Sequence, residues 1–194
     1  MGSWAMSWLA HELSEAGFDA RALALHSMSD SPEAHVARLA RAVVESDTDR
    51  IHLMGHSLGG VILLRYLQNA MDKRLGRAVL LGAPALGCQA ARQLDRQPWG
   101  GLLGNSRELW LAPFAQAVQG NVDVGAIAGD HAFGLGALFV SLEGPNDGVV
   151  TVAETRIAGL RDHIVLPVSH SAMLISAEVS RQAAAFLKAG RFLR

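Results

Sequence analysis

The sequence has little of several features that would assign it to a specialised class of protein. It contains one cysteine, Cys88, so it cannot form an internal disulfide, and a cysteine-based metal site is not expected. Its formal net charge is −1, and Lys73 and Lys188 are its only lysines. This charge balance gives no reason to expect nucleic acid or an anionic membrane as a partner, and a small neutral or apolar substrate fits it better.

Targeting and membrane signals are also missing from the sequence. The first ten residues carry no basic group before their apolar run, so they do not form a signal peptide. The longest nearly uncharged stretch, residues 132–142, is too short to span a bilayer. A single cysteine is compatible with a reducing compartment, and we therefore predict a cytoplasmic protein with no integral membrane segment.

The length and composition indicate one globular domain that covers residues 1–194. Hydrophobic residues make up 50% of the chain and charged residues 18%, so the chain can bury a core and disorder is not expected. A chain of this length buries about 70% of its unfolded surface on folding. We find no internal repeat, low-complexity tract or linker.

Strand-like and helix-like patterns alternate along the chain. Helical spacing of apolar residues and end signals predict helices over residues 4–16, 32–47, 58–75 and 171–187. Short apolar runs predict strands over residues 18–25, 51–54, 78–81, 122–128 and 162–168. This order predicts an α/β fold, a doubly wound and mostly parallel sheet with helices on both faces. In such sheets ligands bind at the carboxyl ends of the strands.

A glycine-rich turn joins the strand at 51–54 to the helix that follows it. Its sequence is Gly55-His56-Ser57-Leu58-Gly59-Gly60, which places Ser57 between two glycines where a sharp turn leaves no room for side chains. The turn lifts the Ser57 hydroxyl clear of the sheet edge, beside the unpaired N–H groups that begin the helix. A nucleophile whose reaction forms an oxyanion needs this geometry. The alternative is an ordinary serine in a flexible turn.

This turn resembles the nucleophile elbow of small bacterial lipases and esterases of the α/β-hydrolase superfamily. The resemblance extends through residues 144–150, Gly-Pro-Asn-Asp-Gly-Val-Val, and through Pro167-Val168-Ser169-His170, and so covers nearly the whole chain. It implies a serine hydrolase that cleaves carboxylic esters through a Ser-His-Asp triad and an acyl-enzyme intermediate. In this family the acid and then the histidine follow the serine along the chain.

Four of the eight histidines are candidates for the base. His170 is favoured because it follows the last predicted strand at the ligand-binding edge, and because residues 168–174 resemble the family's terminal histidine loop. His163 begins the same strand and should lie at the opposite edge of the sheet. His56 should pack or form hydrogen bonds locally, and His131 is a further candidate.

Two aspartates are candidates for the acid. Asp147 lies in an Asn-Asp-Gly turn between the last two predicted strands, and a surface turn is the ordinary explanation of that pattern. The resemblance to the family's acid loop favours Asp147 as the triad acid. Asp130 is the alternative because it directly follows a strand.

The implied reaction is acyl transfer to water. His170 takes the proton of Ser57, Ser57 attacks the ester carbonyl of a small-molecule ester or lipid, and the N–H of Leu58 holds the oxyanion. No metal or cofactor is needed. The same triad could also serve an acyltransferase or a thioesterase.

The front of the chain differs from the family pattern. Relatives begin with an apolar strand ending in His-Gly, whose loop donates the second oxyanion N–H, and that strand normally lies between the two placed here at 18–25 and 51–54. Its absence predicts an N-terminally shortened fold with exposed strand edges, through which a homodimer could form. It also leaves a weakly active or inactive binding module as an alternative function.

The segment 85–121 has a looser pattern, interrupted by proline and glycine and rich in leucine and tryptophan. Two interpretations carry equal weight. The segment could form a small lid over an acyl-chain pocket, or its apolar side chains could complete the core.

Overall fold

Four parallel strands form the sheet at the centre of the structure, a computed structural model that describes residues 3–25, 30–98, 100–114, 118, 122–132 and 141–194. The strands are β1 (Ile51–His56), β2 (Leu75–Leu81), β3 (Asp123–Gly129) and β4 (Asp162–Leu166), and they lie side by side in the order β1-β2-β3-β4. Each neighbouring pair is parallel. The carboxyl ends of all four strands therefore meet at one edge of the sheet, as the alternating sequence pattern predicts.

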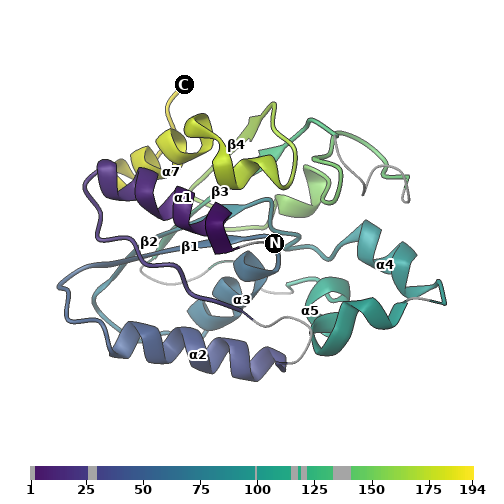
Figure 1. Cartoon of the computed structure of the whole chain (residues 1–194), viewed down its shortest axis with the longest axis horizontal. Helices are drawn as coiled ribbons and strands as arrows, with labels where there is room; N and C mark the ends of the chain where they lie inside the picture. The colour runs from purple at the N-terminus through teal and green to yellow at the C-terminus, as the bar shows by residue number, and fades with distance from the viewer. Residues whose placement is uncertain (1–2, 26–29, 99, 115–117, 119–121, 133–140) are drawn as a thin grey trace.

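Helices cover both faces of this sheet (Figure 1). Helices α1 (Ser3–Glu15) and α7 (Ala177–Ala189) pack on one face, and α2 (Pro32–Val44) and α3 (Leu58–Leu67) lie on the other. The other helical segments in the described part of the chain are α4 (Gln89–Asp95), α5 (Arg107–Leu111) and the 3-10 turns η1 (Gly100–Ser106), η2 (Ala153–Thr155) and η3 (Ala172–Ile175). The α/β fold class and the helices on both faces are confirmed.

The alternation of side chains along β2 divides the core between the two faces. Val79 and Leu81 pack against α1 and α7, whereas Ala78 and Leu80 pack against α3. All four side chains are buried, so β2 is covered on both sides. This is why its sequence reads as one apolar run without alternating polar residues.

Helix α7 lies close against β3 because a glycine makes room for an aromatic ring. A Cβ atom on Gly125 would lie 2.6 Å from the ring of Phe186, which is closer than van der Waals contact allows. Phe186 is fully buried and also packs against Phe192, with 4.9 Å between the ring centroids. The pair of rings holds the end of the chain against the sheet.

Three element predictions are wrong. The predicted helix 171–187 is interrupted at Ser176, whose extended backbone separates η3 from α7. Residues 18–25 form no strand, because no neighbouring strand among the described residues offers them backbone partners. Helix α3 ends at Leu67 and does not continue to 75, and Gly76 lies inside β2. The helix stops before a turn in which the Asp72 carboxylate accepts hydrogen bonds from the N–H and the guanidinium of Arg74.

Strand β1 is an edge of the described sheet, as the sequence predicts for a fold without the family's first strand. No structural observation addresses pairing between two copies, and the homodimer stays a prediction.

No helix among the described residues is long and apolar enough to cross a membrane. Within the predicted stretch 132–142, residues 133–140 lie outside the description.

Much of the described part of segment 85–121 belongs to the core. Leu109 in α5 is fully buried against the apolar side of α3, and Cys88, Ala91 and Leu103 form a cluster with Val150. Leu86 and Leu102 are exposed, however. The described side chains therefore favour the core interpretation for the inner side of this segment. Residues 99, 115–117 and 119–121 lie outside the described part of the chain.

Candidate active site

Ser57 occupies the turn between β1 and α3 in a strained backbone conformation. Its φ of 55° and ψ of −125° make it the one non-glycine residue with positive φ in the described part of the chain. The turn is possible because Gly55 and Gly60 leave space. A Cβ atom on Gly55 would lie 2.6 Å from the backbone of Gly59, and one on Gly60 would lie 2.5 Å from the side chain of Ala83. The predicted sharp strand-to-helix turn is present, but Gly59 is not one of the glycines that it requires, because a Cβ atom there would meet only the side chain of Leu25 at 3.7 Å.

The side chains of Ser57, His170 and Asp147 form a continuous chain of hydrogen bonds. The Nδ1–H of His170 donates to Oδ2 of Asp147 over 2.7 Å, and Nε2 of His170 lies 2.9 Å from the hydroxyl oxygen of Ser57. Because a carboxylate can only accept, Nδ1 carries the proton and Nε2 is free to accept the proton of Ser57. The structure thus brings together the three residues that the sequence predicts as a triad.

The Asp147 carboxylate is held by its own loop. Its second oxygen, Oδ1, accepts hydrogen bonds from the N–H groups of Val149 at 2.9 Å and Val150 at 2.7 Å. The side-chain carbonyl of Asn146 accepts the N–H of Gly148 at 3.0 Å, which closes the Asn-Asp-Gly turn. Asp147 is only 1% exposed. The turn therefore aims the carboxylate inward, and the interpretation as an ordinary surface turn does not apply.

His170 lies in the loop that follows β4, at the carboxyl edge of the sheet. Its backbone N–H donates to the carbonyl of Asp147 over 2.9 Å, in addition to the bond between the two side chains. The loop is closed by the N–H of Met173, which donates to the carbonyl of Ser169 over 3.1 Å. Asp147 therefore fixes both the backbone and the ring of His170.

Gly82 has a role in this site that the sequence reasoning missed. It directly follows β2 with a φ of 51°, and a Cβ atom there would lie 3.0 Å from Oδ2 of Asp147 and 3.2 Å from Nδ1 of His170. Only a residue without a side chain leaves the Asp147–His170 hydrogen bond undisturbed. The signal in the sequence was a glycine immediately after a strand that ends at the ligand-binding edge.

Leu58 begins α3 directly after Ser57. As the first residue of the helix, it has no intrahelical acceptor for its N–H. The positive end of the helix dipole also lies here, so an anion forming on an atom bonded to Ser57 is favoured. This placement matches the oxyanion position predicted for Leu58.

The alternative residues lie away from this hydrogen-bonded chain. His163 lies near the start of β4, at the amino edge of the sheet that the sequence predicts for it. Its Nε2 forms a hydrogen bond with the hydroxyl of Thr155 at 2.9 Å. Asp130 and His131 are exposed after β3. His56 is partly buried and contacts the loop of His170 through a hydrogen bond, so its partner is distant in the chain rather than local.

Cys88 is not placed to act as a nucleophile. It is buried beside the acid loop, with its thiol 3.6 Å from the carbonyl of Val149. Burial raises the pKa of the Cys88 thiol to about 11, so it is protonated at neutral pH. The described residues also contain no group of three or more side chains arranged to hold a metal ion.

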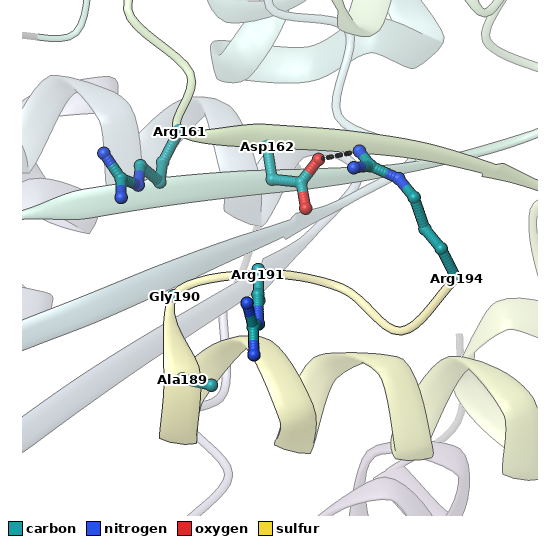
Figure 2. Close-up of a pocket in the computed structure, with 6 residues that line it drawn as sticks. All are labelled: Arg161, Asp162, Ala189, Gly190, Arg191 and Arg194. Carbon is teal, nitrogen blue, oxygen red and sulfur yellow. Dashed lines mark hydrogen bonds and ion pairs between the residues drawn. The ribbon is translucent and has the colours of Figure 1, made fainter.

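A cavity of about 460 Å³ lies at the amino end of β4, and Figure 2 shows the residues that line it. The Asp162 carboxylate accepts the N–H of Phe192 over 2.9 Å and pairs with Arg194 at 2.6 Å. These contacts hold the segment after α7 against the sheet. Because Ser57 and His170 lie at the carboxyl ends of the strands, this cavity is separate from the candidate site.

Three partly buried histidines, His52, His56 and His163, predict how the stability of the fold depends on pH, and burial lowers the pKa of His52 as it does for the other two. Burial lowers the pKa of His56 from 6.5 to about 3, and burial with nearby Arg156 lowers the pKa of His163 from 6.5 to about 4. Below pH 6.5 the unfolded chain binds these protons and the folded chain does not. We therefore expect these histidines to make their whole contribution to the free energy of unfolding above pH 7. This free energy should decrease as the pH falls from about 6.5 towards 4.

Urea denaturation at pH 7 and pH 5 measures this decrease. His163→Asn removes one of these groups, so the variant should lose less stability than the wild type between these pH values. His11→Asn, at an exposed position of α1, is the matched control and should behave as the wild type does. An unfolding free energy that is equal at both pH values in the wild type would contradict the prediction.

Comparisons with known proteins agree with this architecture. A sequence profile described as the alpha/beta hydrolase fold matches residues 4–123. No curated protein sequence matches the chain closely enough to count as a relative.

Solved structures with the same fold include a lipase, a carboxyl esterase and a pyrethroid hydrolase. The mature form of Bacillus licheniformis lipase BlEst2 is similar with a TM-score of 0.75 and 18% identity, over 95% of this chain and 84% of that one. The metagenomic carboxyl esterase MGS0156 has a TM-score of 0.59 and 14% identity, over 82% and 61% of the two chains. A pyrethroid hydrolase from Sphingobium faniae JZ-2 has a TM-score of 0.61 and 14% identity, over 95% and 92%. At these identities the likeness concerns the fold.

The profile match covers more than half of the chain, and the parallel sheet, the strained serine turn and the loops at the carboxyl edge fit it. The chain belongs to the alpha/beta hydrolase fold family.

Proposed function

We propose that the chain is a serine hydrolase that cleaves carboxylic esters, with Ser57 as nucleophile, His170 as base and Asp147 as the acid that orients the base. The observation that carries the proposal is the unbroken sequence of hydrogen bonds from Asp147 through both ring nitrogens of His170 to the Ser57 hydroxyl. A hydroxyl on a strained turn, with a base already in contact, is what nucleophilic catalysis by serine requires.

The reaction proceeds in two halves. Nε2 of His170 takes the proton of Ser57 as its oxygen attacks the ester carbonyl, and the N–H of Leu58 donates to the oxyanion that forms. His170 then gives that proton to the leaving alcohol as the carbon–oxygen bond breaks, which leaves an acyl group on Ser57. A water molecule, deprotonated by His170, attacks the acyl group, and His170 returns that proton to the Ser57 oxygen as its bond to the acyl carbon breaks and the acid leaves. The sequence of steps needs no metal or cofactor.

The proposed substrate is a small neutral or apolar ester, including a lipid ester. The acid loop supports this, because Val149 and Val150, which follow Asp147 and Gly148, pack in an apolar cluster with Cys88, Leu103 and Trp110. Two of the proteins with similar structures are named as a lipase and a carboxyl esterase, and these names agree with an ester as substrate.

Turnover of p-nitrophenyl acetate, butyrate and octanoate by the purified chain tests the proposal. We expect release of one carboxylic acid for each p-nitrophenolate, with water as the acceptor. Addition of methanol or a thiol distinguishes a transferase, in which the acyl group would appear mainly on the added acceptor. A folded chain that releases no p-nitrophenolate would contradict the proposal and favour an inactive binding module.

Gly82→Ala tests whether the space beside the triad matters for activity. The new methyl group would press on Asp147 and His170 from 3.0 and 3.2 Å, and alanine at a φ of 51° costs about 1 kcal/mol. We expect kcat to fall on the order of tenfold to a hundredfold, because small misplacements of reacting groups are costly. The measurement is ester turnover together with thermal unfolding.

Gly101→Ala provides the matched control for this substitution. A Cβ atom on Gly101 would meet nothing within 4 Å, and the residue is exposed. Its activity should equal that of the wild type. Equal activity in the Gly82→Ala variant would show that the site tolerates the extra methyl group and that the spacing argument is wrong.

A further inference from the structure

His56 connects two parts of the site that follow the two outer strands of the described sheet, β1 and β4. It is the last residue of β1 and immediately precedes Ser57, whereas His170 follows β4, and strands β2 and β3 lie between them. The Nε2–H of His56 nevertheless donates to the backbone carbonyl of His170 over 2.9 Å. The two imidazole rings also contact each other, with 4.7 Å between centroids and 46° between planes.

This hydrogen bond gives a partner to the backbone carbonyl of His170, which takes no part in the triad. The N–H of His170 donates to the carbonyl of Asp147, and its two ring nitrogens bond to Asp147 and Ser57. The carbonyl is bonded by His56. Asp147 therefore holds the N–H and the ring of His170, and His56 holds its carbonyl, so loss of the His56 bond would remove one of the hydrogen bonds that fix this residue.

The His56 ring meets the chemical requirements of such a contact. A carbonyl can only accept, so Nε2 of His56 must carry a proton. Burial and the neighbouring His170 ring lower the pKa of His56 to about 3, so the ring is neutral at neutral pH. The titratable groups that face it are His170 and Asp147. A neutral ring beside His170 does not oppose the positive charge that His170 acquires when it takes a proton.

We propose that His56 is a positioning residue, which holds the backbone and ring of His170 at the distance from Ser57 that proton transfer requires. It couples the nucleophile turn to the loop of the base through one hydrogen bond and one ring contact. The inference rests on the proposed hydrolase function, because positioning matters only if His170 is the base. His56 itself does not contact the reacting atoms and does not exchange protons with substrate.

Three substitutions separate the hydrogen bond from the ring contact. His56→Gln keeps an N–H donor at nearly the same reach, His56→Phe keeps a ring without a donor, and His56→Ala removes both. We expect His56→Phe to lower kcat on the order of tenfold to a hundredfold with little change in KM, and His56→Gln to recover most of the loss. His56→Phe should also shift the pH at which kcat/KM is half-maximal, because it changes the surroundings of His170. His11→Phe, at an exposed position, is the control.

The readouts distinguish positioning from general destabilisation. Thermal unfolding identifies any variant that does not fold. If His56→Phe does not fold, the kcat of His56→Gln is compared with that of the wild type, and a large loss in a folded His56→Gln variant would overturn the proposal. Equal kcat in His56→Phe and wild type would overturn the proposal. Equal losses in the Gln and Phe variants, with no shift of the pH profile, would also overturn it.

A measurement that does not depend on activity separates this proposal from the function on which it rests. In protein labelled with ¹⁵N at histidine, nuclear magnetic resonance should show His56 protonated at Nε2, and His56→Phe should shift the Nδ1–H signal of His170. If the wild type shows this pattern but hydrolyses no ester, the proposed function fails while the contact stands. If the His170 signal is unchanged by His56→Phe, the positioning role fails whatever the activity.

Discussion

Ser57→Ala is expected to reduce ester turnover by about four to six orders of magnitude. The substitution removes the atom that, in the proposed mechanism, forms a covalent bond with the acyl group, while the backbone turn and the His170–Asp147 bond remain. Alanine is not larger than serine, so the packing around this 6% exposed side chain should be preserved. The measurement is kcat/KM for a p-nitrophenyl ester, with circular dichroism to verify the fold.

Ser171→Ala is the matched control for the loss of the nucleophile. Ser171 is an exposed neighbour of His170 and makes no side-chain cap hydrogen bond to η3. Its variant should retain wild-type turnover. If Ser57→Ala retained the activity of the wild type, the nucleophile would have to be a different residue.

Asp147→Asn is expected to lower kcat by about 10⁴-fold with the fold intact. An amide does not stabilise the proton on Nδ1 of His170, so the ring no longer presents an unprotonated Nε2 to Ser57. The asparagine oxygen can still accept the N–H groups of Val149 and Val150, so the loop should keep its shape. Steady-state kinetics over a range of pH measure the loss.

The same substitution at the alternative acid decides between the two candidates. Asp130 is exposed, and Asp130→Asn should leave kcat unchanged. A loss of activity in Asp130→Asn, with full activity in Asp147→Asn, would reverse the assignment of the acid.

The local parts of this architecture could be predicted from the sequence. The turn around Ser57 depends on glycines within a few residues of it, and the apolar run of β2 reflects burial on both faces. The N-cap of α2 is equally local, because Ser31 accepts the N–H of Ala34 over 3.3 Å. Such features are encoded in short stretches, and for that reason they appear in a single sequence.

Most of the parts that could not be predicted depend on contacts between distant segments, whereas the early end of α3 precedes a local turn formed by Asp72 and Arg74. Residues 18–25 have the composition of a strand, but a strand forms only if a neighbour satisfies its backbone groups. The space at Gly82 depends on side chains from two loops far along the chain. The bond from His56 to His170 spans 114 residues and has no local signature. Pairing of two copies through β1 stays a prediction, and light scattering over a range of concentrations would test it.

The claim that Ser57, His170 and Asp147 act together is tested most directly by covalent labelling with a fluorophosphonate probe, with the adduct located by mass spectrometry. We predict one adduct, on Ser57, which disappears in His170→Ala and persists in His131→Ala. Absence of labelling in the folded wild-type chain, or an adduct on another residue, would contradict the account.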